Sequence, residues 1–240
     1  MTGLKVYADR IVLVTGARRG VGALLVDHFL AGGAQVIGLS RELDTARDVP
    51  GYTAIACDVG DPASVAAAFE TVRKQFGRVD IAINNAAVLT SQHAMIMPPA
   101  AARSMIETNI FGTFLVSREA AKLMRKGKWG RIVNIGSMAV SLEPIGDSVY
   151  AATKAAVGTL AGVLAKELAP LNITCNTLGI TAIETDMLSQ LPKPKVDAVV
   201  AALTMPRYAT ADDICNVVDF FASPRSGYIT AQTVYLGGVN

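Results

Sequence analysis

Ile11-Val-Leu-Val-Thr-Gly-Ala-Arg-Arg-Gly-Val-Gly22 is the stretch that decides the fold. Its first five residues are an unbroken, mostly β-branched apolar run, as expected of a strand that is covered on both faces. Glycines then recur at positions 16, 20 and 22, and a helical pattern begins among them. Because free N–H groups at such a helix start bind a pyrophosphate, the stretch predicts a dinucleotide-binding loop. An ordinary glycine-rich turn is the alternative.

The alternation of short apolar runs with longer helical patterns continues along the chain. Seven runs are predicted as strands: Ile11–Thr15, Gln35–Leu39, Thr53–Cys57, Asp80–Asn84, Arg131–Gly136, Ile173–Thr177 and Gln232–Leu236. Helices are predicted at residues 20–31, 62–76, 100–125, 148–169 and 211–222. The pattern predicts an α/β fold, a doubly wound Rossmann-type sandwich whose seven-stranded parallel sheet is flanked by helices. Residues 42–52 are few, so a helix there is expected to be vestigial.

The composition indicates one large domain. The chain has 240 residues, 51% of them hydrophobic and 18% charged, and lacks a Pro/Gly/Ser-rich linker. We therefore expect a single domain over 1–240, with a cofactor-binding half at about 1–130 and a catalytic and substrate half at about 131–240. The formal net charge is only +2, with basic residues spread along the chain. Nucleic acid is therefore not expected as a partner.

Two further features bear on location. No apolar run approaches the roughly 18 residues of a membrane span, and Met1–Tyr7 lacks the pattern of a signal peptide. Cys57, Cys175 and Cys215 lie far apart, each within an apolar run, and are predicted as buried free thiols of a reducing compartment. A cytoplasmic protein without a membrane partner is the prediction. With only two histidines in the chain, no metal site is expected.

The end of the second predicted strand bears on the choice of cofactor. An acid at this place usually accepts a hydrogen bond from the ribose 2′-hydroxyl of NAD. Here Ser40 and Arg41 stand at the strand end, and Arg18 and Arg19 lie in the glycine loop. Arginine binds phosphate well, so these residues predict NADP(H). The alternative is that the arginines are solvated loop residues, and Glu42 argues against the prediction.

Tyr150-Ala-Ala-Thr-Lys154 places a phenol and an ammonium one helical turn apart. The lysine charge is expected to lower the tyrosine pKa from about 10 and so to make an acid–base pair. Ser137 follows a predicted strand, where its hydroxyl could hold a carbonyl oxygen beside the tyrosine. Asn109 lies in the middle of a predicted helix against its propensity, which often marks function. A surface pair is the alternative for Tyr150 and Lys154.

These motifs together resemble the short-chain dehydrogenase/reductase family along nearly the whole chain. The matching residues are Thr15–Gly22, Asp58-Val59, Asn84-Asn85-Ala86, Asn109, Ser137, Tyr150 and Lys154. Within the family the chain is most similar to the 3-oxoacyl-(acyl-carrier-protein) reductases, through Trp129–Ser137, Ile183–Met187 and Tyr228-Ile-Thr.

The resemblance implies roles for particular residues. Tyr150 would protonate the substrate carbonyl oxygen and Ser137 would hydrogen-bond it. Lys154 would bind the nicotinamide ribose, and Asn109 would anchor a water chain that re-supplies the proton. NADP(H) is expected to contact Gly16, Arg18, Arg19, Gly20, Val21, Gly22, Ser40, Arg41, Asp58, Val59, Asn85, Ala86, Ala87, Tyr150, Lys154, Ile183 and Thr185.

The substrate is expected to lie under a lid at about 183–207, of which Met187 to Met205 form the mobile part. Ser137, Tyr150, Met187 and Leu188 are the predicted substrate contacts. The apolar lid suits an acyl chain or another apolar ketone, although its residues could equally pack on a neighbouring helix. Two departures from the family pattern fall around the cofactor cleft: Ala87 replaces a glycine, and Ile180-Thr181 replaces a Pro-Gly pair.

The expected activity is NADPH-dependent reduction of a 3-oxoacyl thioester, either free or bound to a carrier protein. Arg125, Lys126, Lys128 and Arg131 resemble one basic docking patch of the carrier-protein reductases, but they could also be cations at a helix C-terminus. The second basic position of that surface is Leu171. The alternatives are a dehydrogenase of a free secondary alcohol or cyclic ketone, and a non-catalytic NADP-binding scaffold. Relatives imply a homotetramer or homodimer, formed through helices 100–125 and 148–169 and the edge of the last strand.

Overall fold

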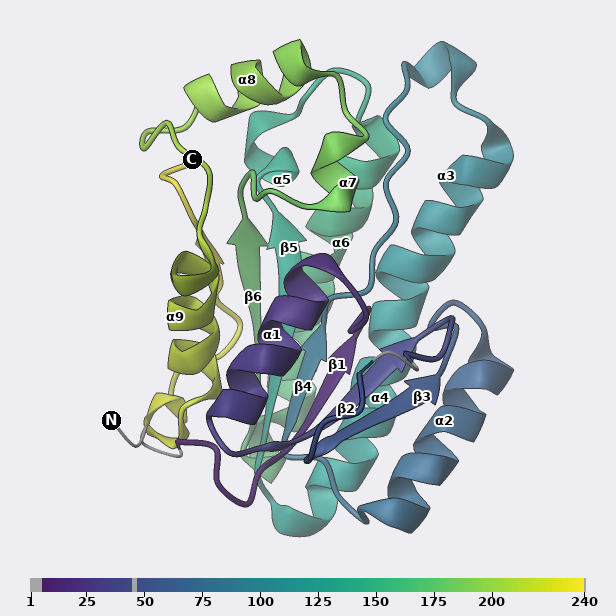
Figure 1. The fold of residues 1–240 in the computed structure, drawn as a ribbon, viewed down its shortest axis with the longest axis vertical. Coiled ribbons are helices and arrows are strands. Elements are labelled where there is room, and N and C mark those ends of the chain that lie inside the picture. The colour runs from purple at the N-terminus through teal and green to yellow at the C-terminus, as the bar shows by residue number, and fades with distance from the viewer. Residues whose placement is uncertain (1–5, 45–46, 240) are drawn as a thin grey trace.

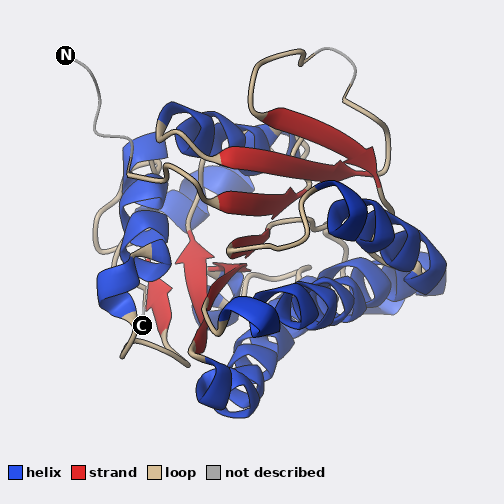
Figure 2. Cartoon of the chain, turned by 90° about the horizontal axis from the view of Figure 1, so that it is seen from below, coloured by secondary structure: helices blue, strands red, loops and turns tan. Residues whose placement is uncertain are grey.

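The chain folds into three layers, with a parallel sheet between two layers of helices (Figure 1 and Figure 2), in a computed structural model that describes residues 6–44 and 47–239. The strands are β1 (Ile11–Thr15), β2 (Gln35–Ser40), β3 (Tyr52–Ala56), β4 (Ile81–Asn84), β5 (Gly130–Ser137), β6 (Ile173–Ile180) and β7 (Thr233–Tyr235). They pair in the order β3-β2-β1-β4-β5-β6-β7, and every pair is parallel. The predicted seven-stranded Rossmann-type sandwich is thus confirmed, and β6 runs three residues further than predicted.

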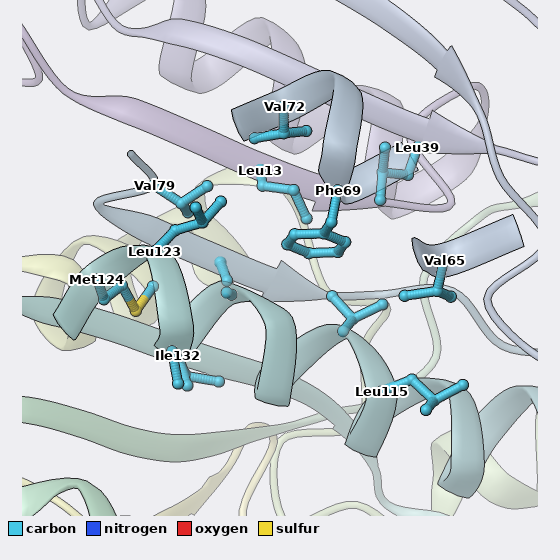
Figure 3. Close-up of a cluster of buried hydrophobic side chains, with 14 of the residues drawn as sticks. Leu13, Leu39, Val65, Phe69, Val72, Val79, Leu115, Leu123, Met124 and Ile132 are labelled. Carbon is cyan, nitrogen blue, oxygen red and sulfur yellow. The ribbon is translucent and has the colours of Figure 1, made fainter. Parts of the chain in front are cut away.

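Alternate residues of β1 supply the two cores. Val12 and Val14 pack in the layer that contains α1 (Gly20–Ala31) and α9 (Ala211–Ala222). Both helices have the bounds that the helical patterns predicted. Leu13 packs on the other face, toward α2 (Pro62–Gln75), α4 (Thr113–Met124) and α6 (Ser148–Leu168). Figure 3 shows Leu13 near Phe69 of α2. A fully buried side chain of this kind stabilises the fold by about 1.5–3 kcal/mol, so both faces of the sheet contribute.

The strand order positions the site. From β1 the sheet grows toward β2 and β3 on one side and toward β4 to β7 on the other. The helices that follow β1 and β4 therefore leave in opposite directions. In such sheets the crevice at the carboxyl ends of these two central strands is where ligands bind. Between β2 and β3 the described residues, 42–44 and 47–51, contain no helix, in keeping with the expected loss of the second helix.

The helix predicted over residues 100–125 is wrong as a single regular helix. The structure has α3 (Pro99–Ile106), a π turn over Glu107–Gly112 and α4 (Thr113–Met124). The Asn109 amide bridges to the main chain of Val88 and to the Thr153 hydroxyl. The Thr113 hydroxyl donates to the Asn109 carbonyl at 2.8 Å. These tertiary hydrogen bonds compensate for the widened turn, which sequence propensity alone does not reveal.

Helix α6 bears on the expectation that no segment spans a membrane. Among the described helices, α6 with its extension to Leu171 is long and apolar enough to cross a membrane by length and composition. It packs on β5 and β6 instead, and its buried face includes Lys154 and Thr153. The helix is therefore a core element of the sandwich. Lys154, Lys166 and Glu167 interrupt its apolar residues, so the helix passes the test by composition without being the unbroken apolar run that a membrane span would show.

Shorter elements surround the carboxyl ends of the strands. They include α5 (Ala139–Leu142), α7 (Asp186–Ser189) and α8 (Lys193–Ala201), with a 3-10 turn at Ala94–Ile96. The 3-10 turns at Arg125–Gly127 and Ala169–Leu171 lie instead at the amino ends of β5 and β6, and a further one is at Pro224–Ser226. Figure 1 shows α7 and α8 beyond the ends of β5 and β6. These two helices lie within the segment predicted as a lid, and the sequence analysis had missed both.

Candidate active site

The predicted phosphate loop joins β1 to α1 and leaves the start of the helix open. Gly16 and Gly20 have φ values of +65° and +54°, which L side chains rarely adopt. Arg19 precedes the helix in an extended conformation, and no side chain of the described residues caps its first turn. The N–H groups of that turn are therefore available to an anion, where the helix dipole favours negative charge.

Thr15 and Asn85 hold the loop in place. The Thr15 hydroxyl accepts hydrogen bonds from the N–H groups of Asn85 and Ala86, at 3.0 and 2.9 Å. The Asn85 amide donates in return to the Thr15 carbonyl at 2.9 Å. The ends of β1 and β4 are thereby tied together under the loop. The sequence analysis included Thr15 in the matching motif Thr15–Gly22 but gave its hydroxyl no role, although a hydroxyl next to the glycine loop was a usable signal.

Gly22 corrects the predicted cofactor contacts. A Cβ atom at Gly22 would lie 2.1 Å from the Gly16 carbonyl oxygen and 2.6 Å from the Asn85 amide nitrogen. Gly22 therefore packs the helix against the underside of the loop, and it does not line the cleft. Its role is to bring α1 close to the strand, one of the three uses of glycine in such loops.

A cavity of about 830 Å³ follows the carboxyl ends of β1, β2, β4, β5 and β6. Apart from Gly22, the residues predicted to contact the cofactor all line it: Gly16, Arg18, Arg19, Gly20, Val21, Ser40, Arg41, Asp58, Val59, Asn85, Ala86, Ala87, Tyr150, Lys154, Ile183 and Thr185. The walls also include residues that sequence reasoning did not name as contacts: Leu39, Glu42, Cys57, Val88, Thr108, Ile135, Gly136, Ile180 and Asp186. The size suits a large ligand, since ligand sites commonly span about 300–1,000 Å³.

The end of β2 combines an orphaned hydroxyl with charged side chains. The buried Ser40 Oγ has no hydrogen-bond partner within the described residues, an arrangement that costs free energy unless a ligand or water completes it. Arg41 is exposed at the same rim. Arg18 forms an ion pair with Glu42, the residue that argued against a phosphate site. One arginine of the predicted cluster is thus engaged by an acid, while the Ser40 hydroxyl fits a polar ligand group.

Tyr150, Lys154 and Ser137 meet where the cleft reaches β5 and α6. All three are nearly buried, and the Lys154 Nζ lies 5.8 Å from the centre of the Tyr150 ring. The same Nζ donates to the Ile135 carbonyl at 2.8 Å, which fixes the ammonium against β5. The predicted acid–base pair is therefore a buried pair on the cleft wall rather than a pair on the surface.

The expected direction of the tyrosine pKa is wrong for the chain by itself. Burial raises the pKa of Tyr150 to about 12, the Ser137 hydrogen bond lowers it, and the Asp147 carboxylate raises it further. Burial also lowers the pKa of the Lys154 ammonium to about 8. Removal from water disfavours the charged form of both groups, and burial is the largest cause of both shifts. The phenol is consequently neutral at ordinary pH.

Asn109 lies behind the cleft. Its side-chain oxygen accepts from the Val88 N–H at 2.9 Å, and its amide donates to the Val88 carbonyl and the Thr153 hydroxyl, both at 3.0 Å. The Thr153 hydroxyl in turn donates to the Tyr150 carbonyl at 2.7 Å. Asn109 thereby connects the wall at Val88 to the helix turn that carries Tyr150. Thr108, its neighbour, lines the cleft in its place.

A second, smaller cavity adjoins the cleft at Tyr150. It measures about 100 Å³, and it is lined by all four predicted substrate contacts, Ser137, Tyr150, Met187 and Leu188. Most other walls are apolar and come from four segments: Leu89, the stretch that contains Met138 and Pro144, Ile180–Ile183 at the end of β6, and the predicted lid residues Leu191, Val196 and Val199. Lys195 and Asp147, which sequence reasoning missed, also line this cavity.

The predicted basic patch is wrong at one residue. Arg131 is 1% exposed and stacks on the Trp129 ring, and its guanidinium donates to the Ser223, Pro224 and Gly130 carbonyls. Burial of this kind makes Arg131 a structural residue at the base of β5. Arg125, Lys126 and Lys128 are exposed, so only these three could meet an acidic partner.

Comparison with known proteins identifies the family. Residues 10–195 match the family described as short chain dehydrogenase. The chain belongs to the short-chain dehydrogenase family. It is 34% identical over 237 residues to the 3-oxoacyl-(acyl-carrier-protein) reductase FabG of Salmonella typhimurium, covering 97% of each chain.

Solved structures of this family share the whole architecture. A putative gluconate dehydrogenase from Agrobacterium tumefaciens is 28% identical with a TM-score of 0.90, covering 98% of this chain and 97% of the other. ElxO with NADP bound is 27% identical with a TM-score of 0.86, covering 95% and 96%. The chain is thus a FabG-like short-chain dehydrogenase, an oxidoreductase acting on CH–OH groups in a family that uses NAD(H) or NADP(H).

Proposed function

We propose that this enzyme uses NADPH to reduce a ketone to a secondary alcohol, with a 3-oxoacyl thioester as its preferred substrate. The observation that carries the proposal is the position of Tyr150, which lines both the large cleft and the small cavity. A phenol at this junction can meet a carbonyl oxygen in the small cavity beside a nicotinamide in the cleft. The similarity to the FabG reductases supports the choice of a thioester.

Within this proposal, the bound cofactor supplies the hydride. Tyr150 acts as the general acid, because its raised pKa keeps the hydroxyl protonated until a carbonyl oxygen accepts the proton. Ser137, at the end of β5, hydrogen-bonds the same oxygen. Lys154 binds the ribose and stabilises the phenolate that remains after proton transfer. Asn109 anchors the water chain that re-supplies the proton, from its position against Val88 and Thr153.

The preference for NADPH rests on the rim at the end of β2. The Ser40 hydroxyl and the exposed Arg41 guanidinium are the groups that would bind a 2′-phosphate there. Glu42 is held by Arg18, which reduces its repulsion of a phosphate. Gly16, Gly20 and the open first turn of α1 provide the seat for the pyrophosphate.

The test is Tyr150→Phe, assayed by NADPH oxidation with acetoacetyl thioesters. We expect kcat to fall at least ~100-fold, the low end for loss of a general acid, with cofactor affinity unchanged. Tyr228→Phe is the matched control, because Tyr228 is fully exposed and should leave kcat as it is. Turnover of Tyr150→Phe at the wild-type rate would remove the tyrosine from the mechanism.

A second candidate is a dehydrogenase of a free secondary alcohol or cyclic ketone, favoured by the likeness to the putative gluconate dehydrogenase. Parallel assays of thioesters, free ketones and polyols separate the two. The apolar walls at Leu188, Leu191 and Val199 favour an apolar substrate over a polyol. Cofactor binding without turnover across the whole panel would instead support a non-catalytic scaffold.

We also expect self-association through the helices that carry the predicted interface. Phe111 of the π turn and Val163 of α6 are 40% and 50% exposed, unusually open for such side chains. Phe111 stacks on Phe114, which extends the apolar surface. Sedimentation equilibrium should give the mass of a dimer or tetramer, and a monomer mass would contradict this expectation.

A further inference from the structure

One side chain, Lys195, fastens the lid helix α8 to the opposite wall of the small cavity. Its Nζ donates to Asp147 Oδ1 at 2.7 Å, to Ser91 Oγ at 2.5 Å and to the Ile145 carbonyl at 3.0 Å. An ammonium has three N–H donors, so these acceptors use all of them. The lysine is thus fully engaged, with its side chain only 21% exposed.

The three acceptors come from two different segments of the fold. Ser91 lies in the loop after β4, whereas Ile145 and Asp147 precede α6, whose first turn carries Tyr150. Asp147 occupies the N-cap position of α6, where an aspartate usually accepts from the helix N–H groups. Its side chain makes no such cap with the described residues. The nearly buried carboxylate is instead paired with Lys195, so a single ammonium joins three segments around the cavity.

The remaining room in the cavity is small. Its free volume is about 100 Å³, and Lys195 with Val196 and Val199 of the same helix forms one wall. For scale, an apolar cavity of about 150 Å³ holds one benzene molecule. Only a few carbon atoms fit beside the Tyr150 hydroxyl while α8 keeps this position. A longer chain that is to stay beneath α8 needs the helix to move outward, which breaks the contacts of Lys195.

We propose that Lys195 is a specificity-determining latch, which holds α8 closed and restricts the reacting ketone to one with a short, uncharged acyl group. Longer chains react only when the latch opens. Lys195 is the cation among the residues that line the cavity. Because all of its donors are engaged, it cannot bind the carboxylate of a substrate while α8 is closed. The acyl part of this inference rests on the proposed ketone reduction, whereas the latch itself does not.

Hydrogen exchange tests the latch without any substrate. In Lys195→Met the amides of residues 193–201 should exchange about tenfold faster, as expected when hydrogen bonds to a charged group are lost, while those of α9 keep their rates. Lys193→Met is the matched control, since Lys193 lies on the same helix and, within the described part of the chain, pairs only with exposed Asp197 at 2.8 Å. Unchanged exchange in Lys195→Met, or equal acceleration in the control, would overturn the latch.

A second variant guards against misfolding. Removal of Lys195 alone leaves the Asp147 carboxylate buried without compensation, which destabilises proteins strongly. Lys195→Met combined with Asp147→Asn removes both charges and should fold while keeping the faster exchange of α8. Lys195→Arg retains the charge and should restore slow exchange.

Substrate length tests the specificity. The ratio of kcat/KM for 3-oxodecanoyl to acetoacetyl thioesters should rise about tenfold or more in Lys195→Met, and should be unchanged in Lys193→Met. A constant ratio would overturn the role in specificity. The same ratio is measured with 2-decanone and 2-butanone. If the ketones show the shift and no thioester is reduced, the thioester proposal fails and the latch stands.

Discussion

The two ends of the cleft are built by different means. At the glycine loop the groups that face the cleft are mainly backbone, positioned by Gly16, Gly20 and the uncapped start of α1. At Tyr150 the groups are side chains, and two of them titrate far from their ordinary pKa values because they are buried. The backbone end is therefore sensitive to added atoms, and the side-chain end is sensitive to changes of charge and hydration.

The largest expected effect tests the backbone end. Gly22→Ala places a methyl group 2.1 Å from the Gly16 carbonyl oxygen, so α1 must move away from the loop. We expect a loss of at least ~3 kcal/mol in the free energy of unfolding, as for severe overpacking. Cofactor binding should weaken with it, as measured by urea denaturation and by titration with NADPH.

Gly162→Ala is the control for this comparison. Gly162 lies within α6, and a Cβ atom there meets nothing within 4 Å among the described residues. Because alanine favours a helix over glycine, this variant should gain up to about 1 kcal/mol. If both variants lose stability alike, the contrast between a packed and an open glycine disappears.

The pH dependence of the free energy of unfolding tests the side-chain end of the cleft through the titration of Lys154. The pKa of Lys154 is about 8 in the folded chain and 10.5 as the ordinary value, so between these limits the unfolded chain holds more protons. The free energy of unfolding of the wild type should therefore rise relative to Lys154→Met from pH 8 toward pH 10, by on the order of 2 kcal/mol. Urea denaturation at several pH values measures the difference. A difference that stays constant with pH would mean that the lysine titrates as it does in water.

The smallest expected effect is on cofactor affinity at the rim of the backbone end, where the Arg41 side chain is expected to bind the additional phosphate of NADPH. Arg41→Ala should weaken NADPH about tenfold and change NADH little, because only NADPH carries the additional phosphate. Isothermal titration with both cofactors measures this, with Arg103→Ala as a control on the distant helix α3. Equal weakening of both cofactors would assign Arg41 a structural role.

The fold could be predicted from sequence because its strands are continuous apolar runs. The run Ile11–Thr15 is predicted to the residue, since a doubly covered strand needs continuous apolar side chains. The helix over 100–125 failed because its π turn depends on contacts of Asn109 with Val88 and Thr153, which lie far away in sequence. Helix α8 was missed because its few residues carry no clear periodic pattern.

The site divides in the same way. Tyr150 and Lys154 are neighbours on one helix, so their spacing alone predicts that they meet. Lys195 and Asp147 are 48 positions apart, and only the tertiary fold shows that they pair. Arg131 was assigned to a surface because sequence shows its charge but not the carbonyls that surround it. The pKa of Tyr150 was misjudged because the depth of burial is likewise a tertiary quantity.

The π turn at Glu107–Gly112 has a consequence for how this helix can change over time. A widened turn absorbs one additional residue, so α3 and α4 keep the phase of an uninterrupted helix on either side. A deletion of one residue in this turn would leave α3 and α4 packed as before. It would remove only the bulge and the Asn109 amide that the bulge carries. Insertions and deletions are usually confined to loops, but this position can acquire or lose a functional group inside the core.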